Sequence, residues 1–226
     1  MTADEGGTTA PSRPAAAARR KGERAPAVTR AALLEAGIQE FAASGFGGAR
    51  TDRIARRANS NERSLYYYFG SKQGLYVAAL EHLYERQAAA EAALELDRLD
   101  PRDGLRQLIA FTWRYYQDNP EFLGMLATEN LYRAKHLRDS EKIRAIASPK
   151  MRLLEGILAR GVAAGHFRRD ITATDLFLTF SGLLYFYLSN RWTLSSYLDR
   201  DLDAAPARDA WLTHVTQLTM EHALRR

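Results

Sequence analysis

The stretch that decides the fold is "NERSLYYYFGSKQGLY", residues 61–76. Its centre holds four consecutive aromatic residues, Tyr66, Tyr67, Tyr68 and Phe69, between charged and turn-forming residues. Such a run is compatible with a buried strand, with a piece of core helix, or with a helix whose aromatic side chains contact a partner. The rest of the sequence has no segment with clean period-two alternation, so a strand would lack a partner strand. A helix is therefore favoured.

Helical spacing of about 100° per residue sorts these side chains into two groups. Leu65 and Phe69 share one face and are expected to dock the helix onto a core, with Tyr68 half-buried at the edge. The other face carries Arg63, Ser64, Tyr66 and Tyr67. Two tyrosines facing solvent add little stability, whereas such groups bind phosphates and base edges. The alternative is that the tyrosines only pack the core of a three-helix unit.

The preceding segment, "TDRIARRANS" (residues 51–60), predicts a partner helix. Thr51 is expected as its N-cap, Ile54 and Ala58 as its inward face, and Asn59-Ser60 as the turn that ends it. Two short helices joined by a tight turn form the helix-turn-helix pattern, in which the second helix enters the major groove of DNA. Ser71 is expected to cap the next helix, where Lys72 can bind a phosphate.

Apolar spacing predicts helices in the rest of the chain as well. A helix in "VTRAALLEAGIQEFAASGFGG" (residues 28–48) is expected to end at Gly45, with Gly47-Gly48 as a loop. Pro149 marks a break, or the first turn of a helix that starts late. The fold class predicted is all-α, and the later helices are expected at residues 73–94, 101–118, 120–135, 140–165, 172–198 and 206–224.

The positive charge is concentrated in the first third of the chain. Residues 1–72 hold 12 Lys and Arg against 7 Asp and Glu, whereas the rest holds 20 of each. A basic segment on a neutral body indicates that the protein binds a polyanion, either nucleic acid or an anionic membrane surface. Residues 1–25 are expected to be a disordered basic arm. Because this arm has few charges and no bulky apolar anchor, DNA is favoured over a membrane.

Composition and motifs argue against several other classes of protein. The chain of 226 residues has no cysteine, which fits a reducing cytoplasm. Its five histidines form no metal-binding or catalytic spacing, so no metal, cofactor or enzymatic activity is predicted. The longest apolar stretch, residues 176–188, is shorter than the roughly 20 residues of a membrane span. The N-terminus lacks the pattern of a secretory signal.

The order and spacing of "TDRIARRANSNERSLYYYFGSKQGLY" resemble the tetracycline-repressor (TetR) family of bacterial transcription regulators. The resemblance covers residues 29–80 and implies a three-helix DNA-binding domain, residues 26–72, before a helical effector-binding and dimerisation domain, residues 73–226. It implies DNA contacts at Thr51, Arg63, Ser64, Tyr66, Tyr67, Tyr68 and Lys72. The chain departs from the family pattern in three places: the turn, usually Ala-Gly-Val, is Ala58-Asn59-Ser60, Glu62 stands where Lys is frequent, and Arg63 stands where Gly is frequent.

The resemblance also implies a homodimer that represses transcription until a small-molecule effector releases it from its operator. Residues 176–188 are apolar nearly all round, so the last two helices are expected to form the dimer contact; a purely intramolecular core is the alternative. Aromatic and polar residues of the middle helices are candidates for an effector pocket, although aromatic stripes also form cores. These candidates are Trp113, Tyr116, Phe122, Met125, Glu129 and Asn130.

Overall fold

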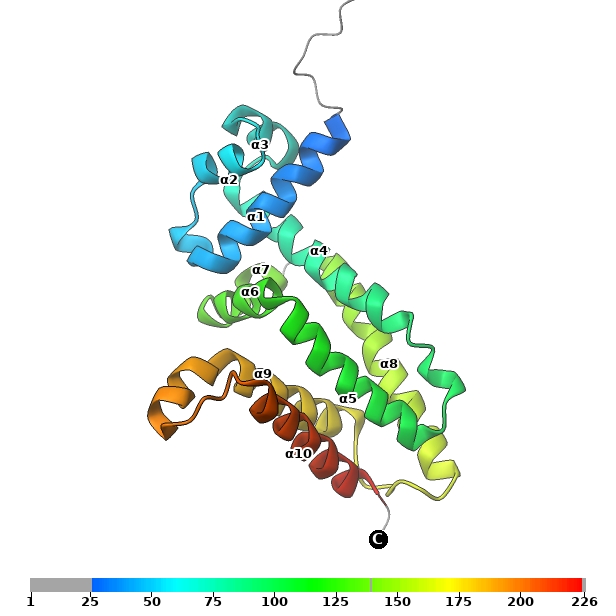
Figure 1. Cartoon of the computed structure of the whole chain (residues 1–226). Coiled ribbons are helices and arrows are strands. Elements are labelled where there is room, and N and C mark those ends of the chain that lie inside the picture. Colours follow the sequence, from blue (N-terminus) through cyan, green and yellow to red (C-terminus); the bar gives the residue numbers. More distant parts are fainter. Residues whose placement is uncertain (1–25, 139, 225–226) are drawn as a thin grey trace, which may run out of the picture.

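The structure is a computed structural model that describes residues 26–138 and 140–224. All its long elements are helices (Figure 1). They are α1 (Pro26–Gly48), α2 (Thr51–Arg57), α3 (Glu62–Phe69), α4 (Lys72–Ala92), the short 3-10 helix η1 (Leu96–Arg98), α5 (Pro101–Asp118), α6 (Pro120–Leu131), α7 (Lys135–Arg138), α8 (Glu141–Ala163), α9 (Ala173–Leu198) and α10 (Ala205–Ala223). The predicted all-α fold is confirmed.

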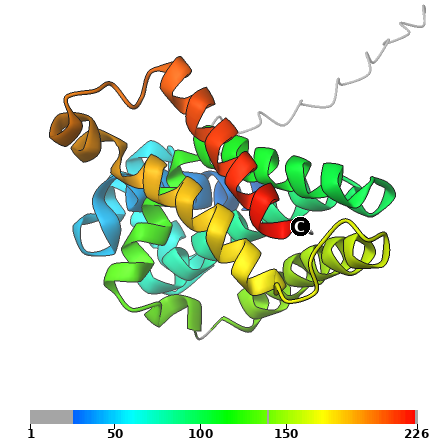
Figure 2. The ribbon, with the colours of Figure 1, turned by 90° about the horizontal axis from the view of Figure 1, so that it is seen from below.

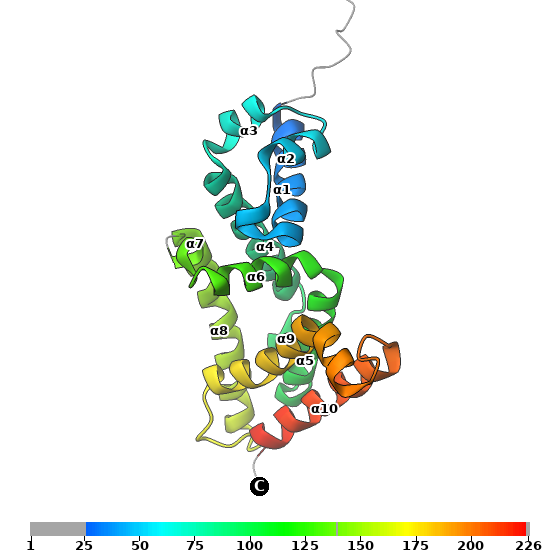
Figure 3. The same cartoon turned by 90° about the vertical axis from the view of Figure 1, so that its left-hand side faces the viewer.

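Helices α1, α2 and α3 form a small unit at one end of the molecule, and α4 leads from it into the larger helical body (Figures 1 and 3). The core of this unit contains Ile38 and Phe41 of α1, Ile54 of α2 and Leu65 of α3, all fully buried. Because α4 continues from one part into the other, the division between residues 72 and 73 stays a prediction.

Two local predictions in this unit are wrong, the loop at Gly47-Gly48 and the N-cap at Thr51. Gly45 has the expected positive φ, 64° with ψ 174°, and interrupts the helix with a kink, but helical geometry resumes after it, so Gly47 and Gly48 belong to the last turn of α1. Thr51 is the first residue of α2, and Arg50 occupies the N-cap without a side-chain hydrogen bond. The Thr51 hydroxyl instead donates to Glu62, 2.6 Å away.

In the larger body, every proline of the described residues except Pro149 lies in the first turn of a helix. Helix α5 spans the predicted residues 101–118, whereas the predicted helix 120–135 is divided by Arg133 and Ala134, both with positive φ. Pro149 neither breaks α8 nor starts it; it lies inside the helix and lines a cavity. The helix continues through the proline, and it packs against α4, α5 and α9.

Helices α9 and α10 pack against each other and against α5, and α9 also packs against α8 (Figure 2). Their inner faces join the core through Leu176, Phe180 and Leu184 of α9 and Val215 of α10, all fully buried. The end of α9 and the connection to α10 project beyond the other helices in Figures 2 and 3. Within the described residues, no helix has the length and apolar character needed to cross a membrane.

Candidate nucleic-acid interface and effector cavity

Helix α3 is capped by a side chain at its start and by a glycine at its end. The Asn61 side chain accepts hydrogen bonds from the main-chain N–H and the hydroxyl of Ser64, at 2.9 and 3.1 Å. At the other end Gly70, with φ 72°, turns the chain, and the Ser71 hydroxyl accepts from the N–H of Gly74 to start α4. Leu65, fully buried, docks the helix on the core. The helix therefore presents one fixed face to solvent.

That outer face carries the side chains expected there. Tyr67 is 81% exposed and Tyr66 47%, Arg63 is also exposed, and Ser64 and Tyr68 are half-buried. The rings of Tyr67 and Tyr68 meet edge to face, 5.0 Å apart. The predicted orientation is thus present, while the DNA contacts themselves stay a prediction. The ammonium group of Lys72 lies over the ring of Phe46, 5.0 Å from the centroid, and its contact with DNA also stays a prediction.

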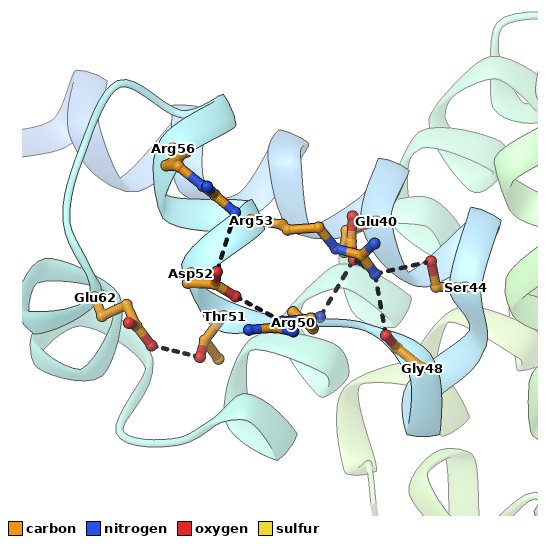
Figure 4. A network of polar contacts seen from close by, with 9 residues as sticks. All are labelled: Glu40, Ser44, Gly48, Arg50, Thr51, Asp52, Arg53, Arg56 and Glu62. Carbon is orange, nitrogen blue, oxygen red and sulfur yellow. Dashed lines mark hydrogen bonds and ion pairs between the residues drawn. The ribbon is translucent and has the colours of Figure 1, made fainter.

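A network of charged groups fixes α2 beside α1 (Figure 4). Glu40, buried on α1, pairs with Arg53 at 2.6 Å and accepts from the main-chain N–H of Arg50 at 3.2 Å. Asp52 binds both Arg50 and Arg56 at 3.0 Å, and the Arg50 hydrogen bond holds the pKa of Asp52 below its usual range. These contacts anchor α2 to α1, and the hydrogen bond from Thr51 to Glu62 joins the start of α2 to the start of α3.

The larger helical body encloses a cavity of about 770 Å³ between α4, α5, α6, α8 and α9. Of the six predicted pocket residues, Tyr116, Phe122 and Asn130 line it. Trp113 and Met125 are instead buried in the core, Trp113 against the ring of Tyr187. Glu129 faces away as well, binding His136 through Oε1 and Nδ1 at 2.7 Å. Three of the candidates are therefore structural residues in this fold.

The cavity walls are mostly apolar, with a few polar groups. Burial, followed by the charge of Glu129, raises the pKa of Tyr84 to about 12. Burial also raises the pKa of Tyr116 and of Tyr185, the latter partly offset by a hydrogen bond to Asn130. These hydroxyls therefore stay protonated at neutral pH and can donate hydrogen bonds. Apolar walls with a few convergent polar groups are typical of sites for small organic ligands.

Comparison with known proteins places both parts of the chain. Residues 33–79 match the family described as "Bacterial regulatory proteins, tetR family", and residues 101–218 match "Tetracyclin repressor-like, C-terminal domain". The chain is 45% identical over 198 residues to the HTH-type transcriptional repressor NicS of Pseudomonas putida, covering 88% of this chain and 93% of that relative. The chain belongs to the TetR family.

More distant relatives agree with this membership. The transcriptional regulator RutR of Escherichia coli is 29% identical over 146 residues, 64% of this chain and 68% of its own. A TetR-family regulator from Marinobacter aquaeolei shares the fold with a TM-score of 0.68 at 20% identity, over 88% of this chain and 97% of that one. FadR of Bacillus subtilis, solved with stearoyl-CoA, has a TM-score of 0.62 at 15% identity, over 85% and 98%. The family and these relatives are regulators of transcription, not enzymes.

Within this TetR-family chain, sequence reasoning missed most of the cavity wall. Helix α4 contributes Tyr84, Gln87 and Glu91, and α9 contributes Phe177, Ser181 and Tyr185. The signal was available for α9, because residues four apart lie on one face of a helix. That face was hidden in a stretch that is apolar nearly all round, which the sequence analysis assigned to the dimer contact.

Proposed function

We propose that this protein is a dimeric repressor that binds its operator through α3 and is released when a small molecule fills the cavity. The observation that carries the proposal is the fixed outer face of α3, where Arg63, Tyr66 and Tyr67 turn away from the protein. Arginine recognises guanine in the major groove, and tyrosine hydroxyls donate to phosphates. Repression is the mode named for the relative NicS.

The proposed dimer contact is formed by α9 and α10. Most of the large apolar side chains exposed outside α3 are on these two helices: Phe186, Trp192, Tyr197, Leu198 and Leu218, together with Leu178, which also lines the cavity. An apolar surface of this extent marks a protein interface. Because Leu176, Phe180 and Leu184 already fill the internal core, the exposed set is left for a second copy. Such a dimer presents two α3 helices to two half-sites.

Helix α6 connects the proposed effector site to the DNA-binding unit. Phe122 and Asn130 of α6 line the cavity. On its other side α6 lies against α1, so closely that a Cβ added at Gly124 would be 2.8 Å from the Ala42 carbonyl oxygen. A ligand that shifts α6 therefore also shifts α1 and the recognition helix. If the ligand binds more tightly to one arrangement of α6, α1 and α3, it changes the affinity of the protein for DNA.

Footprinting of the purified protein on its own upstream DNA tests DNA binding, and we expect protection of two half-sites separated by whole helical turns. A library of small organic molecules is then screened for compounds that raise the thermal unfolding temperature, and each hit is added to a gel-shift assay. We expect hits to weaken operator binding. Hits that tighten operator binding would show that the effector is a corepressor, and an unprotected footprint would reject the DNA-binding assignment of α3.

A further inference from the structure

The first turn of α3 carries a negative charge on the surface assigned to DNA. Glu62 is exposed and accepts a hydrogen bond from the Thr51 hydroxyl through Oε2, at 2.6 Å (Figure 4). The other carboxylates of this network, Glu40 and Asp52, each pair with arginine. Glu62 differs from them, because its partner among the described residues is a neutral hydroxyl and no ion pair of the described chain includes it.

A carboxylate in this position opposes binding to the phosphate backbone. DNA affinity is largely electrostatic, so an uncompensated negative charge weakens binding to every sequence alike. Residues at the start of a recognition helix contact base edges rather than phosphates. A carboxylate there accepts a hydrogen bond from a base that offers an amino group and repels a base that offers only acceptors. The weaker binding to all DNA sequences is then offset by greater selectivity for one base.

We propose that Glu62 selects cytosine in each half-site by accepting a hydrogen bond from its N4 amino group. Guanine and thymine present acceptor oxygens in the major groove, so both are rejected. Adenine offers an amino group, but its N7 acceptor lies beside it and repels the second carboxylate oxygen. The proposal rests on the placement of α3 in the major groove that is proposed above.

Thr51 acts as a positioning residue for this contact. Its hydroxyl holds Oε2, and no described residue hydrogen-bonds to Oε1, which is thereby left for the base. Thr51 is itself held in place because α2 is anchored to α1 by Arg53 and Glu40. The carboxylate is therefore oriented before DNA arrives, which lowers the entropic cost of forming the contact.

Selection of binding sites from a randomised DNA library tests the proposal, using the full-length protein and four variants. We expect Glu62→Ala to lose the cytosine preference at one position per half-site, about tenfold in relative affinity, with the other positions unchanged. Glu62→Gln should change the preference at that position to adenine, because glutamine pairs with N6 and N7 of adenine. Thr51→Val should weaken the cytosine preference at the same position.

Glu35→Ala is the matched control, because Glu35 is an exposed carboxylate of the same unit, on α1. It should raise affinity for all DNA slightly and leave every base preference unchanged. If Glu62→Ala and Glu62→Gln behave like Glu35→Ala, Glu62 is only a helix-stabilising charge and the proposal is wrong. If the wild-type protein enriches no sequence at all, the proposed function fails first, which separates the two conclusions.

Discussion

Glu129 and His136 form a buried pair that fastens α7 to α6. The Glu129 carboxylate lies 2.7 Å from Nδ1 of His136 and also accepts the main-chain N–H groups of His136 and Leu137, each at 3.1 Å. The imidazole packs against Phe46 of α1 and Tyr76 of α4, with ring centroids 5.0 and 4.9 Å away. The pair therefore lies where the DNA-binding unit meets the larger body, and not in the cavity.

His136→Ala should lower the free energy of unfolding by about 2–4 kcal/mol, because it leaves a buried carboxylate without its side-chain partner. Urea denaturation followed by circular dichroism measures the change. His166→Ala is the control, since His166 is partly exposed and lies 3.7 Å from an exposed aspartate, Asp100. We expect almost no change for it. Equal midpoints for the two variants would contradict the structural role of His136.

Tyr67→Ala should reduce affinity for the operator about tenfold and leave the unfolding temperature unchanged. Tyr67 is 81% exposed on α3, so its ring contributes little to the core, while its hydroxyl is proposed to contact the phosphate backbone. Leu131, 84% exposed on α6, is a control that lies outside both α3 and the proposed dimer contact. A gel shift in which Leu131→Ala loses as much affinity as Tyr67→Ala would reject the recognition surface.

The sequence was sufficient for the recognition helix but not for the cavity, and the reason is physical. Leu65 and Tyr67 were placed by helical spacing alone, because a short helix docked on a core has one buried and one exposed face. Trp113 and Tyr116 lie on the same helix, yet only Tyr116 lines the cavity. Whether an aromatic residue of α5 faces the cavity or the core depends on how α4, α8 and α9 pack around α5. No local sequence pattern specifies this packing.

Capping and breaking signals were ambiguous for a similar reason. Thr51 has the residue type of an N-cap, but its hydroxyl donates to Glu62 of the next helix, so a contact between helices replaces a local cap of about 1 kcal/mol. Pro149 has the residue type of a helix breaker, but α8 runs through it.

Phe186→Glu should convert the protein from dimer to monomer and abolish operator binding at concentrations where the wild type binds. Phe186 is 53% exposed on α9, and a charge there would have to be buried in the proposed interface. Leu131→Glu, at an 84% exposed position on α6, should leave the dimer intact. Sedimentation velocity distinguishes the two species. A Phe186→Glu variant that sediments as the wild type would move the dimer contact away from this face of α9.

Two glycines of α8 should respond in opposite directions to alanine. A Cβ at Gly161 would lie 2.0 Å from the buried ring of Phe167, which folds back onto the end of α8, so Gly161→Ala should destabilise by about 1–3 kcal/mol. At Gly156 the nearest atom to an added Cβ is 4.0 Å away, on Arg160. Gly156→Ala should therefore stabilise by about 0.5–1 kcal/mol, through the higher helix propensity of alanine. Thermal and urea unfolding of both variants measure the sign of the change in the free energy of unfolding. Stabilisation by Gly161→Ala would mean that Phe167 does not pack against this turn.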